Sequence, residues 1–291
     1  MLERFLTYLN TEKRVSEHTS IAYAKDVEAF LVFSVVETES DLNEITYQNI
    51  RAWIVELINT NHSNRTVNRK LSALRTFFKW TLKSDLLTVD PMLRIKGPKQ
   101  EKRLPEFVKE EEIELEGLNQ LFPDGFSGLR DRLLIEVLYQ TGIRLSELIN
   151  LKQGDFENQS IKVLGKRNKE RIIPIAPELN EQLIEYLKMP LYKEANIDYV
   201  FLTDKGKKMY PKFVYRKVKY YLSLLTNLNK RSPHVLRHTF ATHMLNNGAG
   251  LETLKEVLGH ANLSATQVYT HNSFEHISKI YEKSHPRGEK L

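Results

Sequence analysis

The chain has 291 residues, of which 41% are hydrophobic and 27% are charged, and it contains no cysteine. This length allows one large domain or two smaller ones, and the composition suits a soluble protein. It has no apolar run long enough to span a membrane and no secretory core, and without cysteine it has no disulfide or thiolate chemistry. We therefore expect a cytoplasmic protein that does not associate with membranes.

The net charge of +6 is unevenly distributed along the chain. Residues 1–63 hold five Lys/Arg and ten Asp/Glu, whereas residues 64–106 hold eleven Lys/Arg and four Asp/Glu. A second basic block, residues 205–237, holds ten Lys/Arg. Two separated basic blocks indicate either a polyanionic partner, nucleic acid above all, or two solvated helix faces.

The N-terminal part of the chain predicts a succession of helices. Apolar residues recur at the helical period over residues 1–10, and Ser16 or Thr19 can cap a second helix that runs to about Phe33. A third helix is predicted over residues 45–59. This stretch therefore reads as an all-helical domain.

A fourth helix is predicted to begin at Ser63 or Asn64. Its apolar residues follow the helical spacing and form one stripe, made of Val67, Leu71, Leu74, Phe78 and Leu82. Its basic residues lie off this stripe. One face should be core and the rest cationic, which would suit a helix laid on DNA phosphates.

The stretch DPMLRIKGPKQEKRLPEF, residues 90–107, predicts an extended basic linker. It has three prolines, one glycine and five Lys/Arg, with little periodicity. Proline disfavours helix both at its own position and at the residue before it. The linker divides the chain into a helical domain, residues 1–89, and a second domain, residues 108–291.

The second domain has a mixed pattern. Helices are predicted over residues 109–122 and 129–142, and helical patterns resume at 211 and continue to about 283. The segments SIKVL (160–164) and RIIPI (171–175), joined by the polar loop GKRNKE, predict a β-hairpin, with 198–203 as a third strand. The fold class is mainly α: a helical N-terminal domain and a mixed α/β domain, mostly helical, with a small antiparallel sheet.

The stretch HVLRHTFATHM, residues 234–244, concentrates histidine and arginine. His234 and Arg237 are three apart, which places them on one face of a helix. His234 and His238 are four apart and could hold zinc, but no carboxylate lies between them and the guanidinium of Arg237 repels a metal. We expect an anion site here, with no metal and no other cofactor.

The stretch TGIRLSEL places Arg144 at the start of a helix. Gly142 ends the preceding helix, and an arginine at a helix N-terminus opposes the helix dipole. Arg144 therefore either accompanies an anion bound at that end or pairs with Glu147. Lys166 lies in the hairpin loop, where a lysine is usually just exposed, and Tyr269 carries no signal by itself.

Four stretches together carry a family resemblance. TGIRLSEL, GKRNKERIIPI, PHVLRHTFATHML and LGHANLSATQVYTH resemble, in order and spacing, the signature boxes of the tyrosine recombinases, in their Xer branch. The segment RTVNRKLSALRTFFKW resembles the end of that family's N-terminal core-binding domain. The resemblance implies a SAM-like core-binding domain at 1–89 and a catalytic domain at 108–291 that ends in a docking helix.

The resemblance also implies site residues. The pocket around one scissile phosphate would be formed by Arg144, Lys166, His234, Arg237 and His260. Tyr269 would attack the phosphorus, form a 3′-phosphotyrosyl link and release a 5′-hydroxyl. Arginine forks match phosphate oxygens, His234 is the candidate for proton handling at the tyrosine, and Lys166 is the candidate acid for the leaving oxygen.

DNA contacts are predicted for the basic residues of both blocks and of the hairpin loop. These are Arg65, Arg69, Lys70, Arg75, Lys79, Lys96, Lys99, Arg167, Lys212 and Arg216. Arg167 stands where the family usually has glycine, which predicts a stiffer and more basic hairpin tip. Phe274, Ile277 and Tyr281 predict an amphipathic C-terminal helix that docks either on its own domain or on a neighbouring protomer.

The implied partners are a double-stranded DNA recombination site, this chain itself or a sister recombinase in a tetramer on two sites, and a DNA translocase as activator. The implied role is resolution of chromosome dimers in the cytoplasm, at the nucleoid. One alternative is an integrase of a phage or conjugative element. Another is a non-catalytic DNA-binding or architectural protein, against which the six intact residues argue.

Overall fold

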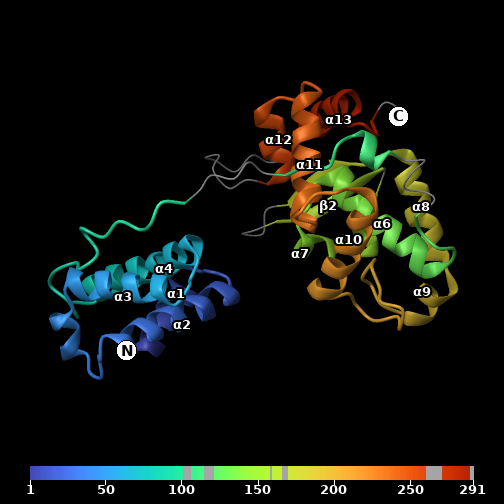
Figure 1. Cartoon of the computed structure of the whole chain (residues 1–291). Helices are drawn as coiled ribbons and strands as arrows, with labels where there is room; N and C mark the ends of the chain where they lie inside the picture. The colour runs from blue at the N-terminus through green and yellow to red at the C-terminus, as the bar shows by residue number, and fades with distance from the viewer. Residues whose placement is uncertain (101–105, 115–120, 158, 166–169, 260–270, 289–291) are drawn as a thin grey trace. The chain divides into compact units, whose positions relative to one another are not determined.

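The computed structural model describes residues 1–100, 106–114, 121–157, 159–165, 170–259 and 271–288. The chain forms two compact units, Met1–Arg103 and Leu104–Leu291, each with its own hydrophobic core (Figure 1). Both are mainly helical, as the sequence predicts. No helix among the described residues is long and apolar enough to cross a membrane.

The first unit consists of helices joined by short turns. They are α1 (Leu2–Thr11), α2 (Glu17–Phe33), a 3-10 turn (Ser40–Glu44), α3 (Tyr47–Asn59) and α4 (Asn64–Lys83). The predicted caps are confirmed: the Ser16 hydroxyl accepts a hydrogen bond from the amide of Thr19, and the Ser63 hydroxyl accepts one from Thr66. Such caps satisfy amide groups that the first helical turn leaves unpaired.

Helix α4 supplies the largest share of the first unit's core. Its predicted stripe is confirmed, because Val67, Leu71, Leu74 and Phe78 are fully buried, with Leu82 partly so. The neighbouring Phe77 packs edge-to-face on Phe5 of α1, with ring centroids 5.2 Å apart. Burying these side chains fixes which face of α4 is left for its basic residues.

The first half of the predicted linker packs along α4. Met92 and Ile95 are buried in the core of the first unit. Asn68 donates a hydrogen bond to the carbonyl of Pro98 at 2.8 Å, and a side chain at Gly97 would collide with Asn68. Residues 92–99 therefore pack on the first unit, whereas Glu106 and Phe107 contact the second. The linker predicted at 90–107 stays a proposal.

The second unit begins with a long buried helix and a small sheet. Its first elements are α6 (Phe126–Thr141), α7 (Leu145–Leu148), β1 (Phe156–Glu157), β2 (Ser160–Leu164) and β3 (Glu170–Pro174). The strands pair antiparallel in the order β1-β2-β3, with Ile161 opposite Ile173. The predicted hairpin is therefore confirmed.

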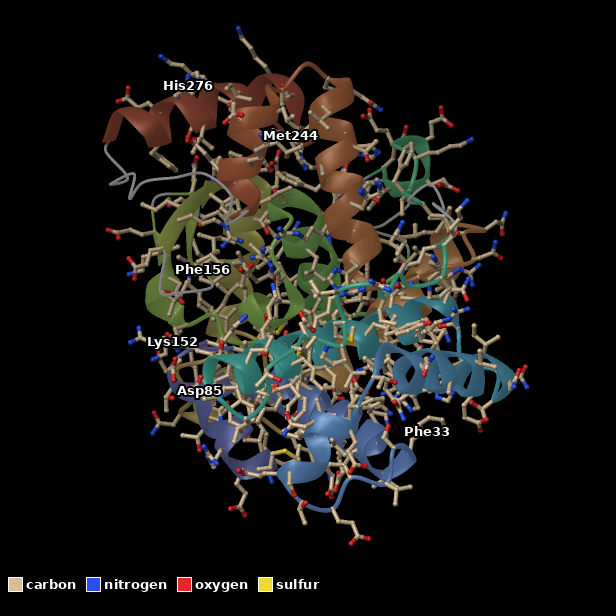
Figure 2. The ribbon with its side chains drawn as sticks, turned by 90° about the vertical axis from the view of Figure 1, so that its left-hand side faces the viewer. Phe33, Asp85, Lys152, Phe156, Met244 and His276 are labelled. Carbon is tan, nitrogen blue, oxygen red and sulfur yellow. The ribbon has the colours of Figure 1, made fainter. Side chains whose placement is uncertain are left out.

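The remaining elements of the second unit are helices. They are α8 (Pro177–Lys188), α9 (Pro190–Ala195), α10 (Pro211–Leu225), α11 (Pro233–Asn246), α12 (Leu251–Leu258) and α13 (His271–Ser284). Figure 1 shows α11, α12 and α13 grouped together, and in Figure 2 the labels Met244 and His276 mark α11 and α13. Helix α11 packs on α6, α12 and α13.

One prediction for the second unit is wrong, and another falls partly on residues that the structure does not describe. Residues 198–203 form no strand: two isolated antiparallel bridges occur there instead, Tyr199 with Lys152 and Leu202 with Lys208. The third strand is β1 instead. Of the helix predicted over 109–122, the structure describes a 3-10 turn at Glu111–Ile113, and residues 115–120 lie outside the described residues.

Hydrogen bonds hold Val108, near the start of the second unit, against α11. The amide of Val108 donates to the Thr239 hydroxyl at 2.9 Å, and its carbonyl lies 2.9 Å from Nε2 of His243. The hydroxyl of Tyr139 lies 3.0 Å from the other ring nitrogen, Nδ1. Burial lowers the pKa of His243, which favours a neutral ring that donates to Val108 and accepts from Tyr139.

The C-terminal helix packs on its own unit in this chain. Ile277 and Tyr281 are buried in the core of the second unit. Beyond α13, Arg287 donates to the Ile113 carbonyl at 2.6 Å and to the buried Glu136 carboxylate at 3.2 Å. The buried ion pair anchors the end of the chain, because either charge left alone would be strongly destabilising.

We predict that Arg287→Met lowers the free energy of unfolding by about 3 kcal/mol, because Glu136 is left buried without its cation. The double variant Glu136→Gln/Arg287→Met should lose clearly less than the sum of the two single losses. Urea unfolding of the three variants measures this, with Lys283→Ala, an exposed site, as the control. Simple additivity would show that the pair does not anchor the C-terminus.

Candidate active site

The end of α6 sets the position of the first predicted site residue. Gly142 takes the left-handed conformation, with φ of 59°, and a side chain there would come within 2.5 Å of the Phe240 ring. Glycine is thus required both by the backbone and by the close approach of α11. The chain then turns so that Arg144 is the N-cap of α7, as predicted.

Glu147 holds two arginines from different elements. Its carboxylate accepts hydrogen bonds from Nη1 of Arg144 at 2.8 Å and from Nη2 of Arg171, on β3, at 2.7 Å. It also accepts the backbone amide of Arg144 at 2.7 Å, which caps α7. The ion pair that the sequence offered as an alternative for Arg144 is therefore present, and it leaves Nη2 of Arg144 to bond elsewhere.

The electrostatics of Glu147 follow from this setting. Burial raises the pKa of its carboxyl, but the hydrogen bond and charge of Arg171 and the two hydrogen bonds from Arg144 outweigh burial and hold the pKa below its usual value. The carboxylate thus stays ionised and fixes the two guanidinium groups at neutral pH. Arg171 is itself buried.

The C-terminus of α12 binds three arginines, Arg144, Arg171 and Arg237. Arg171 donates to the carbonyl of Val257 at 2.6 Å and Arg237 to that of Leu258 at 2.7 Å. Nη2 of Arg144 lies 3.3 Å from the carbonyl of the next residue, Gly259. The last carbonyls of a helix lack intrahelical partners and carry partial negative charge, so they suit cations.

Helix α11 positions Arg237 and His234. Pro233 occupies its first turn, and His234 and Arg237 share one face, as predicted. Arg237 also donates to the carbonyl of Gly142 at 2.6 Å, which ties α11 to the turn that leads into Arg144. His234 is exposed, whereas His238 is partly buried beside the ring of Phe107.

Arg144, His234 and Arg237 line one pocket of about 380 Å³. None of its described lining residues is acidic; the others are Ile143, Leu145, Tyr215, Lys219, Asn229, Lys230, Arg231, Ser232 and Pro233. Burial, and next the positive charge of Arg144, lower the pKa of Arg237 to about 10, so it remains charged at neutral pH. Two such cations beside one cavity favour an anion there.

The structure brings together three of the six predicted catalytic residues. Lys166, His260 and Tyr269 lie outside the described residues, as does Arg167. The described neighbours of two of these sit at the site: Gly259 contacts Arg144, and β3, which follows the hairpin loop, carries Arg171. Among the described residues, no cluster of histidine and carboxylate side chains could hold a metal ion.

The predicted DNA-binding residues of the first unit differ in their surroundings. Arg69 and Lys70 both pair with the buried carboxylate of Asp26, and Arg75 donates to the carbonyl of Ile95. The others are exposed: Arg65, Lys79, Lys96 and Lys99. In the second unit Lys212 and Arg216 are exposed on α10, and Arg216 donates to the hydroxyl of Tyr210.

Two residues that shape the site were not assigned a role from the sequence. The sequence predicts only that Arg171 lies in a strand and that Glu147 is an alternative partner for Arg144. The LSEL spacing, with a glutamate three residues after the N-cap, is a helix-capping signal that could have found Glu147. No local signal marks Arg171, because its partners are distant in the sequence.

The comparison with known proteins places the chain in a family. Residues 107–276 match the phage integrase family, and residues 2–84 match the phage integrase N-terminal SAM-like domain. The chain belongs to the phage integrase family. Relatives named tyrosine recombinase XerC include the protein of Staphylococcus saprophyticus, 39% identical over 99% of this chain and 98% of its own, and that of Listeria innocua, 37% identical over 98% and 97%.

Solved structures share the fold. The crystal structure of the XerH site-specific recombinase bound to a palindromic difH substrate, in a post-cleavage complex, matches with a TM-score of 0.71 and 24% identity, over 96% of this chain and 82% of that one. A lambda integrase dimer bound to a COC′ core site matches with a TM-score of 0.68 and 17% identity, over 92% and 97%. The family matches and the relatives named XerC show that the chain is a tyrosine recombinase of the Xer type, with a SAM-like N-terminal domain and an integrase catalytic domain, as the resemblance implied.

We predict that Glu147→Gln lowers the free energy of unfolding by about 3 kcal/mol, because the buried Arg171 loses its counter-ion. Since the pKa of Glu147 is below its ordinary value of 4.5, its contribution is complete above that pH and is lost as pH falls further. Unfolding measured between pH 3 and pH 7 should therefore show a weaker acid dependence in the variant. Glu252→Gln, at an exposed surface pair, is the control; equal effects of the two changes would contradict the role of Glu147.

Proposed function

We propose that this chain cuts and rejoins DNA at a specific site through a 3′-phosphotyrosyl intermediate. The scissile phosphate would be surrounded by Arg144, Lys166, His234, Arg237 and His260. Tyr269 would be the nucleophile. One observation supports this most: Arg144, from the TGIRLSEL stretch, and His234 and Arg237, from the PHVLRHTFATHML stretch, line the same pocket. None of the described lining residues of that pocket is acidic.

The chemistry follows from charge. The phenol oxygen of Tyr269 forms a bond to phosphorus while the bond from phosphorus to the 5′-oxygen breaks. Negative charge on the non-bridging oxygens is then met by two preorganised guanidinium groups, which cost no reorganisation at the moment of reaction. A free phenol has a pKa near about 10 and needs help to lose its proton, so we assign that proton to His234.

Lys166 would donate a proton to the leaving 5′-oxygen. The phosphotyrosyl link is itself a phosphodiester, so bond energy is conserved. Attack of a 5′-hydroxyl from the partner strand on this link then restores DNA and frees Tyr269. Strands can therefore be exchanged by the reverse of the same step.

The favoured biological role is resolution of chromosome dimers at the nucleoid, in the cytoplasm. Similarity to relatives named tyrosine recombinase XerC over nearly the whole chain supports this role over that of an integrase from a phage or conjugative element. The partners would be a double-stranded recombination site and a tetramer on two sites, built from this chain alone or with a sister recombinase. A DNA translocase would act as activator.

We predict that Tyr269→Phe abolishes the covalent protein–DNA adduct on a nicked suicide substrate while leaving DNA affinity within about threefold, because the phenol oxygen is the nucleophile. Denaturing gels measure the adduct, and gel shift measures affinity. Tyr220→Phe, at an exposed tyrosine of α10 outside the pocket lining, is the control and should react normally. An adduct in Tyr269→Phe would refute the assignment; none in the unaltered chain would favour a non-catalytic binder.

We further predict that Arg65→Gln and Lys79→Gln each reduce the slope of log affinity against log salt by about 1, because each would remove one phosphate contact. Arg75→Gln should change the slope less, since its guanidinium donates to the Ile95 carbonyl within the unit. Fluorescence anisotropy across a salt series measures the slopes. Unchanged slopes for Arg65 and Lys79 would show that this face of α4 does not grip DNA.

A further inference from the structure

The pocket at Arg144 and Arg237 is larger than one phosphate requires. Its volume of about 380 Å³ corresponds to roughly a dozen water molecules, whereas a phosphate group has only five heavy atoms. The remaining wall is made by Tyr215, Lys219 and Arg231, to which the proposed catalytic mechanism assigns no role. This part of the cavity is therefore open to a second ligand group.

Tyr215 and Lys219 lie one turn apart on α10, on one exposed face. The orientation of that face is fixed from behind by the fully buried Asp131 of α6. Its carboxylate accepts hydrogen bonds from Lys217 Nζ at 2.7 Å and from the Tyr221 hydroxyl at 3.1 Å. Lys219 is thus carried by a helix whose rotation about its own axis is constrained.

Arg231 lies just before α11 and lines the same cavity. The backbone there is held by the amide of Lys230, which donates to the Glu106 carboxylate at 3.0 Å. Within the described residues, the buried Nε of Arg231 has no hydrogen-bond partner. A rotation of the side chain toward an acceptor in the cavity would satisfy this donor.

The cations that line the cavity differ in the partners that they have within the protein. Arg144 is paired with Glu147, and Arg237 donates to two backbone carbonyls. In the part of the chain that the structure describes, neither Lys219 nor Arg231 has a carboxylate partner. The N-terminus of α11 also faces the cavity through Pro233 and His234, and its dipole adds positive potential.

We propose that Lys219 and Arg231 form a second phosphate subsite, which binds the phosphodiester immediately next to the scissile one on the cleaved strand. The ligand class is a DNA backbone phosphate, because one continuous cavity is lined both by Arg144 and Arg237 and by Lys219 and Arg231. The proposal rests on the proposed function, since the scissile phosphate occupies the first subsite. Lys219 and Arg231 are positioning residues: gripping two consecutive phosphates fixes both the location and the direction of the strand before attack.

The test uses nicked suicide substrates in which one linkage at a time is a neutral methylphosphonate, from two linkages before the scissile phosphate to two after it. Each is combined with the full-length chain and with Lys219→Ala, Arg231→Ala and Lys188→Ala, an exposed lysine of α8 outside the pocket lining. The rate of adduct formation and the affinity are both measured. Arg231→Lys, which keeps the charge, tests rescue.

We expect one neutral linkage, directly adjacent to the scissile phosphate, to slow adduct formation by the unaltered chain roughly tenfold, because it removes a charged hydrogen-bond acceptor. In Lys219→Ala or Arg231→Ala, the same neutral linkage should slow adduct formation little further, since the substitution has already removed the contact to that phosphate. Lys188→Ala should remain fully sensitive to it, and Arg231→Lys should regain sensitivity.

The subsite would be overturned if, at every linkage, the loss of adduct-formation rate caused by the neutral linkage simply added to the loss caused by the substitution. Equal sensitivity of Lys219→Ala and Lys188→Ala to the adjacent linkage would also overturn it. If the unaltered chain instead forms no adduct that depends on Tyr269, on substrates with all phosphates charged, the proposed function itself fails. The two failures are therefore distinguishable.

Discussion

The catalytic unit depends on how three guanidinium groups are held close together. Arg144, Arg171 and Arg237 all donate to the last carbonyls at the C-terminus of α12, and Glu147 neutralises two of them. Helix carbonyls without intrahelical partners and one buried carboxylate thus offset a repulsion that would otherwise separate the cations. The pKa of Arg237 remains lowered, first by burial and next by the positive charge of Arg144. The two neighbouring cations leave a positive potential that suits a phosphate.

The packing of α6 against α11 positions two of these arginines, Arg144 and Arg237. The turn at Gly142 must be tight enough to bring α6 against α11, and a side chain there would collide with Phe240. Helix α11 carries His234 and Arg237 near its start, and farther along it holds the first described residues of the unit through Thr239 and His243. One helix therefore links the candidate active site to the point where the chain enters the catalytic unit.

Those parts of the fold and of the candidate site that carry a local signal could be predicted from the sequence. Periodicity and capping residues predicted α2, α4 and the β2–β3 hairpin, and the TGIR stretch predicted the Gly142 turn with Arg144 at the next helix start. Residues 198–203 were predicted wrongly as a strand, because β-rich composition does not reveal that they pair only in isolated bridges, with Lys152 and Lys208. Arg171, Lys219 and Arg231 could not be assigned from the sequence, since their surroundings are created by residues far away in the chain.

The central claim is that Arg144 and Arg237 act on a single phosphorus atom. The most direct measurement is a crystal structure of the Tyr269→Phe chain bound to an intact recombination site. Both guanidinium groups should donate hydrogen bonds to non-bridging oxygens of the same phosphate, the one at the cleavage position. Contacts of the two arginines to different phosphates, or to none, would contradict this claim.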